Sequence, residues 1–118
     1  LDKVSILEIK LHHVTDKNKK REIKKEYDTL KKIQDSSVEF TDEIKKLYQF
    51  LKDVNMRMWE IEDKVRICEK NKDFGKDFIE LARGVYLNND KRFRIKLEIN
   101  QILKSDIREI KEYVDYEN

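Results

Sequence analysis

Proline is absent from this sequence of 118 residues, and glycine occurs only twice. These two residues disrupt helices most strongly, so the chain has few points at which a helix must end. No stretch sustains the alternation of apolar and polar residues that is typical of a half-buried strand. The composition therefore predicts an all-α fold, and the length predicts a single domain over residues 1–118.

Cysteine and long apolar runs are also scarce. The single cysteine, Cys68, cannot form an internal disulfide, and no apolar run approaches the roughly 18 residues that a membrane span requires. We therefore expect a cytoplasmic protein with no membrane partner. The chain begins at Leu1 without a Met, inside an amphipathic pattern, which leaves open whether a native N-terminal segment precedes it.

Neither sign of charge is in large excess. Charged residues make up 44% of the sequence, but 27 Lys and Arg stand against 25 Asp and Glu, so the net charge is only +2. A surface of mixed charges does not attract nucleic acid as a whole. Composition alone therefore does not indicate whether nucleic acid is a partner.

Apolar residues at helical spacing dominate the stretch from residue 44 to residue 102. On its first arm they recur every three or four residues, at Ile44, Leu47, Leu51, Val54, Met58, Ile61, Val65 and Cys68. On its second arm the same rhythm places them at Phe78, Leu81, Val85, Ile95, Ile99 and Ile102. Residues 71–75 between the arms are typical of a turn. The pattern predicts two long helices, over 41–70 and 74–104, that pack antiparallel as a hairpin.

Weaker amphipathic patterns predict three further helices. Residues 1–14 and 18–34 precede the hairpin, and a short helix follows Ser105 and Asp106, where we expect the fourth helix to end. Thr41 has the residue type and position of an N-cap for the third helix. We therefore expect an antiparallel bundle of four main helices, built on the long helical hairpin, plus a short C-terminal helix. Residues 88–90 are the only other place where the fourth helix could kink.

Two polar residues, Asn88 and Arg92, interrupt the apolar seam of the fourth helix, and we call this pair the polar plug. In an antiparallel hairpin the plug should lie beside Asn55 and Glu62, with Arg83 nearby on the fourth helix. A buried arginine requires a partner. We expect Glu62 or another carboxylate to neutralise Arg92, which would make the plug structural. The alternative is that the same residues form a cleft that binds an anionic metabolite.

Gly84 stands inside the predicted fourth helix, where it costs roughly 1 kcal/mol relative to Ala. A glycine at such a position suggests close packing against its missing Cβ. We expect a large side chain, such as that of Trp59, to occupy this space.

The second predicted helix carries the most basic surface of the chain. Its lysines include Lys19, Lys20, Lys24 and Lys25. Lysines contact phosphates without reading base sequence, so nonspecific nucleic-acid binding is one interpretation. Glu22 and Glu26 lie among these lysines, so a solvated face with ion pairs between neighbouring turns is the simpler interpretation.

Paired acidic residues are one pattern that suggests catalysis. Glu60 and Asp63 are separated by three positions, as in helical enzymes that hydrolyse nucleotides with magnesium. The other such pair, Glu39 and Asp42, straddles a predicted loop and N-cap and would not share a helix face. No zinc spacing, glycine-rich phosphate loop or nucleophile–base arrangement is present, so the sequence predicts no metal site and no cofactor.

Three motifs follow one another along the chain. They are DKxSILxIK over residues 2–10, DFGxxFIxLARxVYxxND over residues 73–90, and KxxIN over residues 96–100. In this order they resemble an uncharacterised small family of bacterial and phage proteins, and the resemblance covers nearly the whole chain. It implies membership of an all-helical family of unknown function and implies no mechanism.

The sequence favours a structural or protein-interaction module without catalytic activity, because amphipathic faces account for nearly all of its apolar residues. An extended hairpin in so small a chain leaves apolar surface for a second subunit to cover. The candidate residues beside the main seam are Tyr48, Phe50, Trp59, Tyr86, Leu87 and Phe93. We therefore expect a homodimer.

Overall fold

The computed structural model describes the backbone of residues 1–117 and the side chains of residues 1–104. The described backbone forms four helices and no strand, which confirms the all-α class. The helices are α1 (Asp2–His13), α2 (Lys17–Ser37), α3 (Asp42–Lys70) and α4 (Lys76–Glu117). Within this part of the chain, no helix is both long enough and apolar enough to cross a lipid bilayer.

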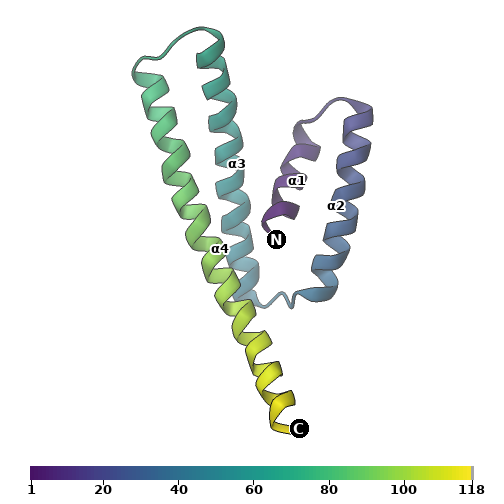
Figure 1. The fold of residues 1–118 in the computed structure, drawn as a ribbon. Helices are drawn as coiled ribbons and strands as arrows, with labels where there is room; N and C mark the ends of the chain where they lie inside the picture. The colour runs from purple at the N-terminus through teal and green to yellow at the C-terminus, as the bar shows by residue number, and fades with distance from the viewer. Residues whose placement is uncertain (118) are drawn as a thin grey trace.

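The four helices form two hairpins that stand side by side and are joined at one end by residues 38–41 (Figure 1). Helices α3 and α4 pack along each other, as predicted, while α1 packs against both α2 and α3. The α3–α4 hairpin extends well beyond the tip of the α1–α2 hairpin. The radius of gyration is 18.4 Å, whereas a compact chain of this length has about 13–14 Å. The molecule is therefore markedly elongated.

The main apolar core lies at the end of the α3–α4 hairpin that is near residues 38–41. Its fully buried members are Ile44, Leu47, Leu51 and Ile99. The loop residues Val38 and Phe40 pack against this cluster, so the loop is anchored. Helix α1 buries a further set against its two neighbours, Val4, Leu7 and Ile9. This short helix is held from two sides, as the width of its apolar face predicts.

The ends of α3 follow from local chemistry. The Thr41 hydroxyl accepts a hydrogen bond from the backbone N–H of Ile44 at 3.2 Å, which confirms the predicted N-cap. At the other end, Lys72 adopts a left-handed conformation with φ of 54°. The carboxylate of Asp73 then accepts from the backbone N–H of Gly75 at 3.2 Å. These contacts close the predicted turn between α3 and α4.

One expectation about the fourth helix was wrong. Helix α4 runs for 42 residues without a break, so it does not give way to a separate short helix after Lys104. Residues 88–90, where the sequence left a kink open, lie within this continuous helix. The Asn88 side chain donates to the carbonyl of Gly84 at 2.8 Å, one turn back, and so stays within the helix. No proline or glycine follows Lys104, so nothing in the sequence removes a backbone hydrogen bond there. Helix α2 likewise continues three residues beyond the predicted end.

The residue that packs on Gly84 is Ile61 and not Trp59. A methyl group added at Gly84 would lie 3.2 Å from Cδ1 of Ile61. This atom is the end of a flexible side chain, and Ile61 borders an open apolar hollow with Leu81 and Cys68. The isoleucine therefore has room to move by a few tenths of an ångström.

We predict that Gly84→Ala stabilises the protein by about 0.5–1 kcal/mol, because Ala loses less backbone entropy than Gly in a helix interior. The matched control is Gly75→Ala, which lies just before α4, where Ala is less favourable than Gly. Urea unfolding followed by circular dichroism measures both variants. A loss of stability in Gly84→Ala would show that the Ile61 side chain cannot move away from the added methyl group.

Candidate functional site

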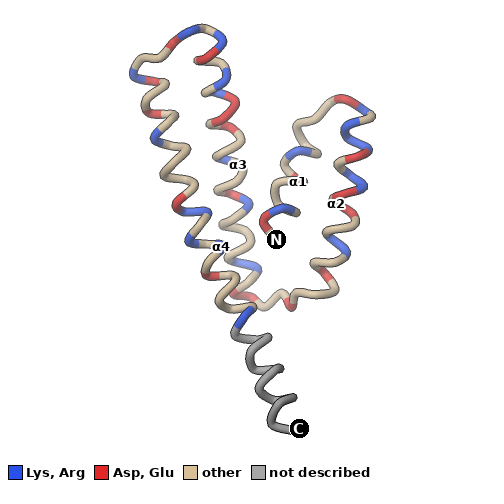
Figure 2. Tube along the Cα trace, viewed as in Figure 1, with Lys and Arg blue, Asp and Glu red and all other residues tan. Residues whose placement is uncertain are grey.

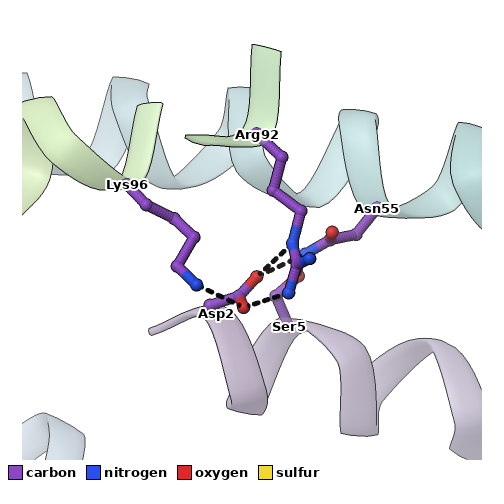
Figure 3. Close-up of polar contacts among 5 residues, drawn as sticks. All are labelled: Asp2, Ser5, Asn55, Arg92 and Lys96. Atoms are coloured by element: carbon purple, nitrogen blue, oxygen red, sulfur yellow. Dashed lines mark hydrogen bonds and ion pairs between the residues drawn. The ribbon is translucent and has the colours of Figure 1, made fainter. Parts of the chain in front are cut away.

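A group of polar side chains joins α1, α3 and α4 around one carboxylate (Figure 3). We call it the Asp2 cluster, and its members are Asp2, Ser5, Asn55, Arg92 and Lys96. Arg92 donates through Nε to Oδ1 of Asp2 at 3.1 Å and through Nη2 to Oδ2. Lys96 Nζ lies 3.2 Å from the same Oδ2. Asn55 donates to Asp2 Oδ1 at 3.0 Å and to the Ser5 hydroxyl at 2.9 Å.

Helical spacing explains how each element contributes to the Asp2 cluster. Asp2 lies in the first turn of α1, where the helix dipole favours a negative charge. Ser5 follows three residues later on the same face. Arg92 and Lys96 are one turn apart on α4, so both cations reach the same carboxylate. Asn55 is buried on α3 and connects Asp2 to Ser5.

The charge state of Asp2 results from opposing effects. Burial by itself raises the pKa of the Asp2 carboxyl, but the hydrogen bonds from Arg92 and Asn55 and the positive charge of Arg92 outweigh it. The pKa of Asp2 is therefore held below its ordinary value of 3.8. The carboxylate is ionised at neutral pH and neutralises Arg92, whose side chain is only 27% exposed.

The partner of Arg92 is thus Asp2, and the specific expectation of Glu62 was wrong. The more general expectation of a carboxylate partner is confirmed. The prediction considered only the two helices of the long hairpin and left out α1, whose first turn lies beside the polar plug. An acidic residue in the first turn of an apolar helix was the signal in the sequence that could have identified Asp2.

The structure brings only some of the predicted ligand-site residues together. Asn55, Glu62 and Arg92 line a common hollow. Asn88 is turned toward the carbonyl of Gly84 in its own helix, and its side-chain oxygen is buried without a hydrogen-bond partner among the described residues. Arg83 is exposed on α4 and does not line the hollow.

This hollow lies between α1, α3 and α4 beside the Asp2 cluster and has a volume of about 350 Å³. Its lining consists of Ile6, Ile9, Lys10, Asn55, Met58, Trp59, Glu62, Arg66 and Arg92. The indole N–H of Trp59 is buried and has no acceptor within the described part of the chain. The Trp59 ring stacks on His13 with 5.1 Å between ring centroids. The hollow is large enough for a small polar molecule, and its lining offers cationic donors and the carboxylate acceptor of Glu62.

The paired acidic residues do not converge on a metal site. Glu60 and Asp63 are exposed on α3, and Asp63 lies 4.0 Å from Arg66. Among the residues that the structure describes, no group of three or more His, Cys, Asp or Glu side chains could hold a metal ion. Glu39 lies in the loop before α3 and Asp42 in its first turn, so this pair straddles the helix start as predicted.

The four lysines predicted as a nucleic-acid contact are all exposed on α2. Lys20 and Lys24 are one turn apart and share a side of the helix, whereas Lys19 and Lys25 point about 100–140° away from Lys24. Acidic residues alternate with basic ones along α2 (Figure 2). The four lysines therefore do not form one continuous basic stripe, and nucleic-acid binding through them stays a prediction.

The surface that we expected a second subunit to cover is only partly exposed. Phe50, Tyr86, Leu87 and Phe93 are between 46% and 66% exposed. The other two candidate aromatics are partly covered: Tyr48 packs edge-on against Phe40, and Trp59 stacks on His13.

Together these features define an all-α protein of two helical hairpins that are joined through a polar cluster at one carboxylate. A family model described as a family of unknown function, DUF6165, matches residues 1–116. The chain therefore belongs to this family, as the three sequence motifs led us to expect. Comparisons with curated proteins and with solved structures found no match.

Proposed function

We propose that this protein is a non-enzymatic helical interaction module that associates with a second copy of itself. The observation that carries the proposal is the exposed apolar surface. Among the side chains of residues 1–104, nine large apolar ones are 45–66% exposed, and five of these lie on α4. Soluble monomers seldom leave so many large apolar groups along one element, because their exposure to water is unfavourable.

The total surface supports the same proposal. The chain exposes 9318 Å², whereas a compact monomer of this mass exposes about 6,800 Å². The difference of roughly 2,500 Å² exceeds the roughly 800 Å² that each partner buries in an interface of standard size. The elongated shape therefore leaves ample area for a stable contact with a second chain.

The Asp2 cluster has a structural part in this proposal. Arg92 is neutralised within the chain, so its charge is compensated without a bound anion. The cluster fixes α1, and through α1 also α2, against the α3–α4 hairpin. This leaves the outer side of α4 as the surface for association.

We predict that the protein has about twice the mass of its 14.4 kDa chain at micromolar concentration. Multi-angle light scattering coupled to gel filtration measures this mass directly. Dilution should then dissociate the complex. A mass of one chain over the whole micromolar range would rule out self-association as the function.

The partner assignment within the Asp2 cluster has its own test. Asp2→Asn should lower the free energy of unfolding by about 2 kcal/mol at pH 7, because it leaves Arg92 and Lys96 without a carboxylate. The pKa of Asp2 is lowered by folding, so the ionised carboxylate stabilises the protein above the unfolded pKa. This contribution declines as the pH falls from 3.8 to the folded pKa, and the two proteins should converge only below that folded pKa.

The control for this measurement is Glu62→Gln, which removes the exposed carboxylate that we first expected to contact Arg92. It should change the unfolding free energy by less than about 0.5 kcal/mol. Urea unfolding at several pH values compares the three proteins. A loss in Glu62→Gln as large as that in Asp2→Asn would contradict the assignment.

The hollow beside the Asp2 cluster supports a second candidate function, the binding of a small anion. The specific observation is the buried indole N–H of Trp59, which has no acceptor among residues 1–104 and borders a hollow that Lys10 also lines. An anion in the hollow would accept from the indole and pair with the ammonium group. Arg92 would contribute less, because Asp2 already neutralises it.

Trp59 is the only tryptophan, so its fluorescence reports on this hollow. Titration with inorganic phosphate or a dicarboxylate should change the emission with a dissociation constant below about 1 mM if the hollow is a binding site. Lys10→Met should weaken this response, whereas Lys64→Met, on the other side of α3, should not. An emission that stays constant in every titration would dismiss this candidate.

A further inference from the structure

Helix α4 carries a second apolar stripe on the side that faces away from α3. We define the outer stripe by its members Ile79, Tyr86, Phe93 and Leu97, which are 56%, 59%, 66% and 45% exposed. Their spacings of seven, seven and four residues keep all four within about 40° of one another around the helix axis. The stripe is therefore continuous along about 27 Å of helix.

The outer stripe is distinct from the seam that holds the hairpin together. The seam faces α3 through residues such as Ile95 and Ile99, of which Ile99 is only 3% exposed. The centre of the stripe lies about 140° around the helix from the centre of this seam. A spacing of seven residues is the repeat by which one helix packs along another. The stripe therefore has the form of a helix-pairing surface.

Two oppositely charged residues border the outer stripe on the same side. Arg83 and Asp90 are seven residues apart and lie about 40–60° from the centre of the stripe. Both are exposed, and neither forms an ion pair with another residue whose side chain is described. Each is therefore available to a partner that docks on the stripe.

Resting on the proposed self-association, we infer that two copies of the chain pair through their outer stripes, with the two α4 helices antiparallel about a two-fold axis beside Tyr86 and Leu87. Arg83 lies 3.5 residues before this axis and Asp90 lies 3.5 residues after it. The axis therefore places Arg83 of each copy against Asp90 of the other. The same axis places Ile79 close to Phe93 of the second copy.

Charge complementarity selects the antiparallel arrangement over a parallel one. In a parallel pair in register, the two-fold axis runs along the helices and places Arg83 and Asp90 of the second copy on the opposite side of the interface. Neither residue would then meet an opposite charge of the other copy from this pair. The antiparallel pair keeps the four residues on one side, forms two attractive contacts and makes the surface self-complementary, as a two-fold interface requires.

The first test compares two phenylalanines of similar exposure. Phe93→Lys places a charge in the outer stripe, and we expect it to convert the dimer to a monomer at micromolar concentration in light scattering. The control is Phe50→Lys on α3, which is 49% exposed and outside the stripe, and it should leave the dimer intact. Circular dichroism verifies that both variants remain helical. A dimer that survives Phe93→Lys but not Phe50→Lys would overturn the interface while leaving self-association standing.

The second test uses charges on the surface of α4, so it does not depend on the core. Arg83→Asp and Asp90→Arg should each weaken dimerisation by about tenfold, since each replaces two attractive contacts by two repulsive ones. The double variant restores both contacts and should return to within about threefold of the original affinity. Single variants that leave the affinity unchanged would contradict the antiparallel pairing. A monomeric wild-type protein would defeat the proposed function itself, so the two failures are distinguishable.

Discussion

The ion pair between Asp2 and Arg92 is the contact on which the arrangement of the two hairpins depends. It connects the first turn of α1 to α4, while Asn55 connects the same carboxylate to α3. Helix α2 contacts α1 far more than any other helix, so its position follows from that of α1. Leaving a partly buried arginine unpaired costs free energy. The position of α1 along α4 is therefore favoured only where Asp2 lies beside Arg92. Apolar packing alone is less selective, because leucine and isoleucine faces tolerate small shifts.

Most of the fold could be predicted because helical periodicity is a local property of the sequence. The apolar rhythm from residue 44 to residue 102 identified both arms of the long hairpin, and Thr41 identified the start of α3. The continuation of α4 beyond Lys104 was not predicted, because Ser105 and Asp106 are residue types that weaken a helix, although they remove no backbone hydrogen bond. A weak preference of this kind is overridden when the residues on both sides are helical.

The polar cluster was harder to predict than the helices, because it depends on contacts between residues far apart in the chain. The sequence showed that Arg92 interrupts an apolar seam and needs a carboxylate, and this general expectation held. It did not show which carboxylate, because Asp2 lies 90 positions away and reaches Arg92 only through the packing of α1 on α3. Ile61 took the place expected for Trp59 at Gly84 for a similar reason: Trp59 turns toward α1, where it stacks on His13.

The lengths of the helices explain why the outer side of α4 stays uncovered within one chain. At 1.5 Å per residue, the 42 residues of α4 span about 63 Å, whereas the 12 residues of α1 and the 21 residues of α2 span about 18 Å and 32 Å. Helix α1 is already held between α2 and α3, and α2 is on the far side of it. Among the described residues, no helix is therefore left to pack along the outer stripe. An apolar stripe of seven-residue spacing that its own chain cannot cover matches the surface of another helix of similar length, and in the dimer that we propose this helix is a second α4 with complementary charges.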